Sequence, residues 1–254
     1  MIDLHCHILP GVDDGAQSLS DSLSMARKAV EQGIQRIVAT PHHMNNSYEN
    51  PKHSIMDRVK DLNEKLQEEK IELEVLPGQE VRIHGEMMEG YKAGEILPVN
   101  HTPYLLVEFP SNHVPRYTEK LFYDLQMNGL IPVIVHPERN QEIIERPELL
   151  YQLVKKGAMT QVTAASICGD FGKKIRNFSI QLIEANLTHF IASDAHNTTT
   201  RTFKMRDAFG VIEKKFGNEM VYYFGENANL LIDGKHVYKE DPERIKRKRI
   251  FYLF

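Results

Sequence analysis

The first residues of the chain carry two histidines at a spacing suited to metal binding. Residues 3–7 read Asp-Leu-His-Cys-His, so His5 and His7 occupy alternate positions of a predicted β-strand and face the same side. Two imidazoles on one strand face can present a pair of nitrogen ligands to a cation. The pattern alone is equally compatible with two incidental polar residues, so its meaning depends on the rest of the chain.

Further apolar, β-branched runs end at residues that bind metals through nitrogen or oxygen. Such runs are typical of buried parallel strands. Runs 36–41, 73–79, 104–107, 132–135 and 190–193 are followed directly by His42, Glu80, Glu108, His136 and Asp194, with His196 two residues later. Unrelated coincidences are a poor explanation for so many endings of one chemical kind. They indicate a shared metal centre.

Amphipathic stretches of helical period lie between these strands and after the last one. The pattern predicts helices at 18–33, 52–69, 116–128, 147–156, 173–186 and 201–216. With residues 159–164 as the sixth, about seven strands alternate with helices, which favours a parallel α/β barrel over an open doubly wound sheet. No dinucleotide-binding glycine fingerprint competes with this prediction. The active site of such a barrel lies at the carboxyl ends of its strands, where the candidate ligands fall.

Composition narrows the class of protein. The 254 residues are 41% hydrophobic and 26% charged, which predicts one globular domain spanning 1–254. A formal charge of -4 argues against a broadly basic surface that binds nucleic acid. No apolar run approaches the roughly 18 to 20 residues of a membrane span, and no secretory signal pattern begins the chain, so we expect a cytoplasmic protein. The basic run at 244–249 is compatible with a solvated helix end or with an acidic partner.

The candidate ligands and their neighbours resemble the PHP (polymerase and histidinol phosphatase) superfamily. Within it, the chain is most similar to the metal-dependent protein-tyrosine phosphatases of bacterial capsule and exopolysaccharide loci. The resemblance covers nearly the whole chain. It rests on residues 3–15 (DLHCHILPGVDDG), 39–43 (ATPHH), 78–80 (GQE), 136–139 (HPER) and 193–196 (SDAH).

The resemblance implies a distorted seven-stranded (β/α)7 TIM-like barrel, the PHP fold, with three divalent metal ions. It assigns the first ion to His5, His7, Glu80 and Asp194, the second to Glu80, Glu108 and His136, and the third to Asp13, His42 and His196. Many relatives have histidine where Asp13 and Glu108 stand. The oxygen-rich ligand set favours manganese, magnesium or iron over zinc, and the resemblance ranks manganese first.

Four further residues near the proposed ligands have predicted roles or remain open. Arg139 and Arg201 follow ligands by a few residues and could grip phosphoryl oxygens with their planar guanidinium groups, as catalytic and substrate-binding residues. Asp3 is predicted to orient an imidazole, whereas Asp14 has no assigned role at this stage.

The function implied by the resemblance is hydrolysis of phosphotyrosine by a hydroxide that the metal ions activate. The implied partner is a bacterial tyrosine kinase with a phosphorylated tail that controls polysaccharide production. A cysteine-based mechanism is excluded, because it requires an arginine six positions after the cysteine, where Cys6 has Val12 and Cys168 has Lys174. Two alternatives stay open: a phosphoesterase acting on a small metabolite such as histidinol phosphate or on a nucleic-acid end, and a catalytically silent metal-binding regulator.

Overall fold

The strands of the computed structural model form a parallel barrel, and the structure describes residues 1–245. Most of the basic run at 244–249 therefore lies outside the described residues. The strands are β1 (Ile2–Cys6), β2 (Arg36–Ala39), β3 (His42–His43), β4 (Glu74–Pro77), β5 (Glu80–Arg82), β6 (Tyr104–Glu108), β7 (Ile131–Val135), β8 (Met159–Thr163) and β9 (Phe190–Ala192). They pair in the orders β1-β2-β4 and β3-β5-β6-β7-β8-β9.

Two of the strand positions are interrupted at the same height. β2 continues into β3 after Thr40 and Pro41, and β4 continues into β5 after Gly78 and Gln79. Proline has no N–H for the ladder, which favours the first break. At the second, a Cβ on Gly78 would lie 2.5 Å from Val38 Cγ1, so the close approach of the two strands requires glycine. Counting each interrupted pair once leaves seven strand positions within residues 1–245.

The barrel closes between its last and first strands. The Asp194 N–H donates to His5 O at 2.9 Å, and the His7 N–H donates to Ala195 O at 2.9 Å. Cys6 and Ala195 form a parallel bridge. These contacts confirm the predicted seven-stranded parallel barrel with β8 in sixth position.

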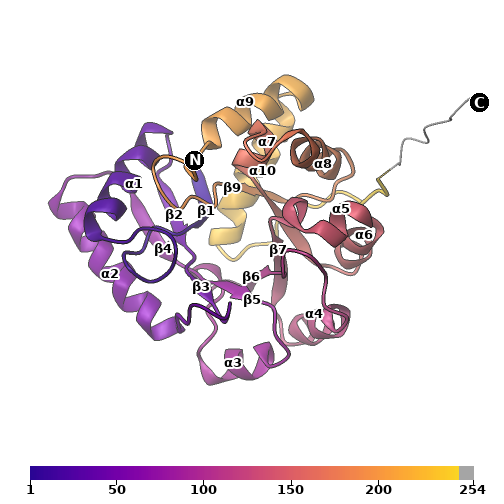
Figure 1. Ribbon diagram of the computed structural model, residues 1–254, viewed down its shortest axis with the longest axis horizontal. Helices are drawn as coiled ribbons and strands as arrows, with labels where there is room; N and C mark the ends of the chain where they lie inside the picture. The colour runs from indigo at the N-terminus through magenta and orange to yellow at the C-terminus, as the bar shows by residue number, and fades with distance from the viewer. Residues whose placement is uncertain (246–254) are drawn as a thin grey trace, which may run out of the picture.

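Helices surround the strands (Figure 1). They are α1 (Leu19–Glu31), α2 (Lys52–Glu68), α3 (Met87–Ala93), α4 (Thr118–Met127), α5 (Gln141–Glu145), α6 (Glu148–Lys155), α7 (Ala164–Cys168), α8 (Lys173–Glu184), α9 (Met205–Phe216) and α10 (Asn218–Ile232), with 3-10 turns at η1 (Val99–His101) and η2 (Pro137–Arg139). Each of the six predicted helices is present. The sequence pattern missed α3, α5 and α7, which are short, and α10, whose Gly225, Asn227 and Asn229 are weak helix formers.

The amino end of the barrel is plugged by α10. Its residues Ala228, Leu231 and Ile232 join the interior cluster formed by inward-facing strand residues such as Leu4 and Leu106. A second, larger cluster packs the outer faces of the strands against the surrounding helices. With one end filled by apolar packing, the opposite end holds the chemically active side chains.

A bulge in β1 turns the first two histidines into the barrel. The register against β2 advances by three residues from Asp3 to Cys6, but by only two from Ile37 to Ala39. One extra residue reverses the alternation of side chains beyond it. Leu4 therefore packs in the interior cluster and Cys6 in the outer one, while the His5 ring remains on the interior side.

Candidate metal centre

Four side chains from three strand ends converge at the carboxyl end of the barrel. The Nε2 atoms of His5 and His7 lie 3.2 Å apart. Glu80 Oε2 lies 3.5 Å from His5 Nε2 and 3.4 Å from His7 Nε2. Asp194 Oδ1 lies at the same two distances, 3.5 and 3.4 Å, from these nitrogens. All four side chains are buried, so two nitrogens and two oxygens face one small space.

The imidazoles at this space are anchored through their other nitrogen. Nδ1 of His5 donates to Gln161 Oε1 at 2.8 Å, and Nδ1 of His7 donates to Asp13 Oδ2 at 2.7 Å. Nδ1 of His196 donates to the backbone oxygen of Asp194 at 3.0 Å. This leaves each Nε2 lone pair directed at the centre, which is the arrangement that metal-binding histidines adopt.

The structure corrects the predicted role of Asp13. Both of its carboxylate oxygens are occupied, because Oδ2 accepts from His7 Nδ1 and from the His42 N–H and Oδ1 accepts from the Gly15 N–H at 2.9 Å. Asp13 therefore orients His7 and holds its own loop. The loop folds tightly onto His7, since a Cβ on Gly15 would lie 2.1 Å from His7 O.

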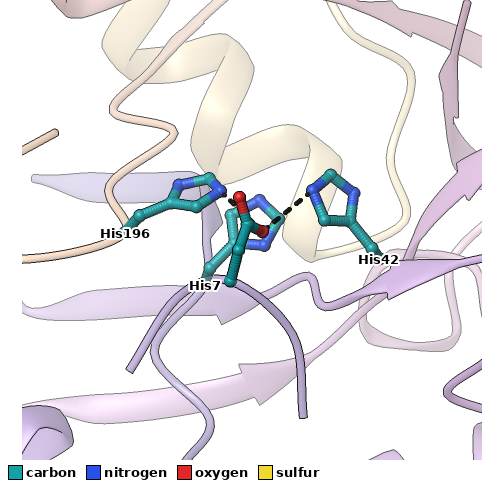
Figure 2. A group of neighbouring side chains, drawn as sticks. His7, His42 and His196 are labelled. Carbon is teal, nitrogen blue, oxygen red and sulfur yellow. Dashed lines mark ion pairs between the residues drawn. The ribbon is translucent and has the colours of Figure 1, made fainter. Parts of the chain in front are cut away.

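Asp14 takes the place that was expected of Asp13. Its Oδ1 lies 3.3 Å from His42 Nε2 and 3.4 Å from His196 Nε2. Figure 2 shows the side chains of His7, His42 and His196 gathered in this group. Together with His7, these residues form a group whose ligand atoms lie within 4.8 Å of one another. The chain offers two adjacent aspartates, and only the loop conformation decides which one faces the histidines.

A second cluster of histidine and glutamate side chains lies beside the first. His42 Nδ1 is 2.7 Å from Glu80 Oε2 and 3.8 Å from Glu108 Oε2, and His136 Nε2 donates to Glu80 Oε1 at 2.8 Å. Although His42 Nδ1 and Glu80 Oε2 are close, their geometry does not meet the angles of a hydrogen bond. Within residues 1–245, His42 Nδ1, Glu80 Oε2 and His196 Nε2 are buried with no hydrogen-bond partner. Nitrogen and oxygen atoms brought together in this way fit a divalent cation.

The electrostatics of the centre show the same demand for positive charge. Burial alone would raise the pKa of Glu80 and Asp194, but His42 and His5 beside Glu80, and Arg139 beside Asp194, hold both pKa values well below the usual range. Burial would lower the pKa of His42, yet Glu80 and Asp14 raise it to about 10. A cation bound at these carboxylates would release such protons from the imidazoles.

Two arginines, Arg139 and Arg201, lie beside the centre. Arg139 Nη2 lies 2.7 Å and Arg201 Nη2 3.1 Å from Asp194 Oδ2. Arg201 Nη1 also lies 3.5 Å from Asp14 Oδ2. Both guanidinium groups line a pocket of about 370 Å³ that opens beside His42, Glu108 and His136.

Two of the predicted ligand positions have a left-handed backbone. His136 has φ 36° and Asp194 has φ 53°, conformations that L-residues adopt at a cost of about 1–3 kcal/mol. Such strain persists where the surrounding structure holds a side chain in a required position. Here it aims both residues inward at the ends of β7 and β9.

Asp3 does not orient an imidazole, and this prediction was wrong. Its carboxylate accepts from the Ser193 N–H at 2.8 Å and from Ser193 Oγ at 2.5 Å. It thereby fastens the start of the Asp194 turn to β1. Gln161 performs the predicted role for His5 instead, and its place as a polar amide in the apolar run at 159–164 was the available signal.

The comparisons with known proteins agree with this geometry. The chain is 52% identical over 254 residues to the tyrosine-protein phosphatase YwqE of Bacillus subtilis, with 100% of both chains covered. It also superposes on a crystal structure from work on YwqE and on CpsB of Streptococcus pneumoniae, which are described as metal-dependent tyrosine phosphatases. The TM-score is 0.95 and the sequence identity is 53%, over 97% of this chain and 100% of the other. Histidinol phosphate phosphatase from Lactococcus lactis shares the fold at 12% identity and a TM-score of 0.51, over 96% and 100% of the chains.

The match to a protein family spans most of the chain. Residues 1–233 match the family described as "Capsular polysaccharide synthesis, CpsB/CapC". Among the described residues, no helix combines the length and apolar character needed to cross a membrane. The chain belongs to the CpsB/CapC family of capsular polysaccharide synthesis proteins.

Proposed function

We propose that this protein is a metal-dependent protein-tyrosine phosphatase that hydrolyses phosphotyrosine with three divalent ions, manganese in the cell, and that residues 1–254 act as one phosphatase domain. The observation that carries the proposal is the convergence of His5, His7, Glu80 and Asp194 beneath two arginines and an open pocket. The similarity to YwqE supports the choice of substrate.

The proposed ligands form three overlapping groups. His5, His7, Glu80 and Asp194 hold the first ion, Glu80, Glu108 and His136 the second, and Asp14, His42 and His196 the third. Asp14 replaces Asp13 in this set because its Oδ1 faces both histidines. The ligand chemistry is rich in carboxylate oxygen, which favours manganese, magnesium or iron over zinc.

The metal ions, when bound, supply Lewis acidity that lowers the pKa of water and neutralises phosphoryl charge. Arg139 and Arg201 bind the phosphoryl oxygens with their guanidinium forks and stabilise the charge that develops on them. Asp194 Oδ2 contacts both arginines and holds them on the same side of the pocket. A tyrosine phenolate, with a conjugate-acid pKa of about 10, leaves with less protonation than a serine alkoxide.

Membership in the CpsB/CapC family supports a proposed cellular role. A bacterial tyrosine kinase with a phosphorylated, tyrosine-rich tail is the proposed partner, and control of capsule or exopolysaccharide synthesis is the proposed outcome. The protein acts in the cytoplasm in this proposal, where such a tail would be accessible.

The test is phosphate release by chelator-stripped protein before and after manganese is restored. Phosphotyrosine peptide, phosphoserine peptide of the same sequence and histidinol phosphate are compared side by side. Manganese-dependent release from phosphotyrosine alone is the expected result. Preference for histidinol phosphate would replace the proposal with a metabolic phosphatase, and no release from any substrate would favour a silent regulator.

A further inference from the structure

The pocket beside the metal centre is lined by both polar and apolar residues. The charged and imidazole side chains are those of His42, Glu108, His136, Arg139, Asp194 and Arg201. Phe109, Val135, Pro137 and Phe171 are the apolar lining residues. The polar residues suffice to bind a phosphate group, so the apolar residues indicate that the ligand also carries a nonpolar group.

Phe171 differs from the other apolar residues that line the pocket. Phe109 is buried and stacks on Phe122, so it belongs to the core. Phe171 is 36% exposed. No other large apolar side chain with comparable exposure lines this pocket in the part of the chain that the structure describes. Its exposure gives it free surface that a ligand could cover.

The turn that carries Phe171 is held in a defined shape. It joins α7 to α8, and the Gly172 N–H donates to Gly169 O at 2.9 Å across the turn. Gly169 and Gly172 have φ values of +97° and +90°, which a side chain at either position would strain. A closed turn with two such glycines presents the phenyl ring at a fixed place on the pocket rim.

The ring also lies beside the group that would hold the phosphate. The Arg139 guanidinium carbon is 5.5 Å from the centre of the Phe171 ring, within the range of a cation–π contact. A phosphoryl group bound by Arg139 is thus next to Phe171. In an aryl phosphate the aromatic ring is one oxygen atom away from phosphorus, so it must occupy the same pocket.

We propose that Phe171 forms the binding site for the substrate's aromatic ring and is a specificity-determining residue that favours aryl over alkyl phosphates. The inference rests on the proposed phosphatase function and adds a residue to it. An aromatic ring on Phe171 gains dispersion and buries apolar surface, whereas the short methylene of phosphoserine reaches too little of it. Selectivity for phosphotyrosine then has two sources, the leaving group and this contact.

The experiment separates ring binding from phosphate binding. Dissociation constants of phenylphosphonate and methylphosphonate are measured by titration calorimetry on the full chain loaded with manganese, for the natural protein and for Phe171→Ala. We expect the natural protein to bind phenylphosphonate about ten-fold more tightly. In Phe171→Ala the preference should fall to about two-fold, because methylphosphonate keeps its contacts with both arginines.

Further variants distinguish an aromatic contact from a change at Arg139. Phe171→Tyr should keep the preference, and Phe171→Leu should lie between the natural protein and Phe171→Ala. Loss of the cation–π contact would weaken the binding of both phosphonates alike and leave the ratio of their dissociation constants unchanged. Tyr222→Ala is the matched control, since it removes an aromatic ring that is 69% exposed on α10.

The outcomes for the inference and for the proposed function differ. An unchanged preference in Phe171→Ala, or equal binding of both phosphonates by the natural protein, would overturn the role of Phe171 while manganese-dependent phosphotyrosine hydrolysis stood. Failure of the natural protein to release phosphate from phosphotyrosine peptide would overturn the proposed function, and the inference with it.

Discussion

Both ends of the barrel bury polar side chains, but the two ends differ in how fully these side chains are hydrogen-bonded. At the amino end, Asn227 Nδ2 donates to His189 O and to Tyr238 O, and its Oδ1 accepts from the Tyr238 N–H at 2.8 Å. Tyr104 Oη donates to Lys235 O at 2.7 Å. Each of these side chains finds the backbone group that matches it.

At the carboxyl end, several buried polar atoms approach one another without forming a hydrogen bond. Within residues 1–245, most buried side-chain nitrogen and oxygen atoms that lack a hydrogen-bond partner belong to this side of the barrel, with Thr118 and Thr188 as the exceptions. An unpaired buried polar atom costs about 1–3 kcal/mol. The difference teaches that matched polar groups stabilise the closed end, while the open end retains unmatched groups suited to binding ions and substrate.

The largest predicted effect is the loss of activity on changing the carboxylate shared by two proposed metal sites. Glu80→Gln should lower kcat/KM for phosphotyrosine peptide by about 10³-fold, because the shared negative charge is removed and cation binding supplies several kcal/mol of transition-state stabilisation. Steady-state kinetics at saturating manganese measure this. Glu74→Gln, an exposed change on β4, is the control. Activity within ten-fold of the natural protein would break the contrast between the two ends.

The matching test at the amino end measures stability. Asn227→Ala should reduce the free energy of unfolding by about 3 kcal/mol, since it removes three hydrogen bonds made by a fully buried side chain. Urea denaturation gives the value, and kcat/KM of the folded fraction should stay within about two-fold. Asn128→Ala, an exposed change at the end of α4, serves for comparison. A stable but inactive Asn227→Ala protein would contradict the assignment of this end to stability alone.

A smaller effect sharpens the roles of the two adjacent aspartates. Asp14→Asn removes the carboxylate that faces His42 and His196 and should lower kcat/KM by about 10²-fold. Asp13→Asn disturbs the partner of His7 Nδ1 and an acceptor for the Gly15 and His42 N–H groups, and should lower kcat/KM by about ten-fold. Metal content after dialysis, measured by elemental analysis, should fall further in Asp14→Asn. The reverse order of effects would restore Asp13 as the ligand.

The smallest predicted effect is a pH dependence of stability from the closed end. Burial, with a lesser contribution from Lys239, lowers the pKa of His189 to about 3, and its Nδ1 accepts from the Thr160 N–H at 3.2 Å. In the unfolded chain the His189 imidazole binds a proton below about pH 6.5, whereas in the folded protein it stays neutral down to about pH 3. The contribution of His189 to the free energy of unfolding is therefore fully present above about pH 6.5 and is lost as the pH falls toward 3.

Relative to His189→Asn, the natural protein should lose about 2 kcal/mol of unfolding free energy between pH 7 and pH 5. Urea denaturation of both proteins at each pH gives the difference, in which the titration of all other groups cancels. Parallel stability profiles for the two proteins would show that His189 does not titrate as its burial requires.

The sequence by itself determined the barrel, because strand and helix periodicity depend on local residue patterns. It also placed the candidate ligands at strand ends, since parallel strands of a barrel bring their carboxyl ends to one rim. His5, His7, Glu80 and Asp194 were predicted as one group and lie together. The barrel and the strand-end positions follow from residue type and spacing, whereas the grouping of these four residues was implied by the resemblance to the PHP superfamily.

Only the tertiary structure decided how individual side chains divide the work. Asp13 and Asp14 are identical in type and adjacent in sequence, and the close packing of Gly15 on His7 turns one toward the His7 Nδ1 atom and the other toward the histidine Nε2 atoms. Asp3 was expected to orient an imidazole, but its carboxylate binds Ser193, and Gln161 of β8 holds His5 Nδ1 instead. Phe171 joined the pocket through a turn distant in sequence. Such choices depend on contacts between segments far apart in the chain, which no local pattern records.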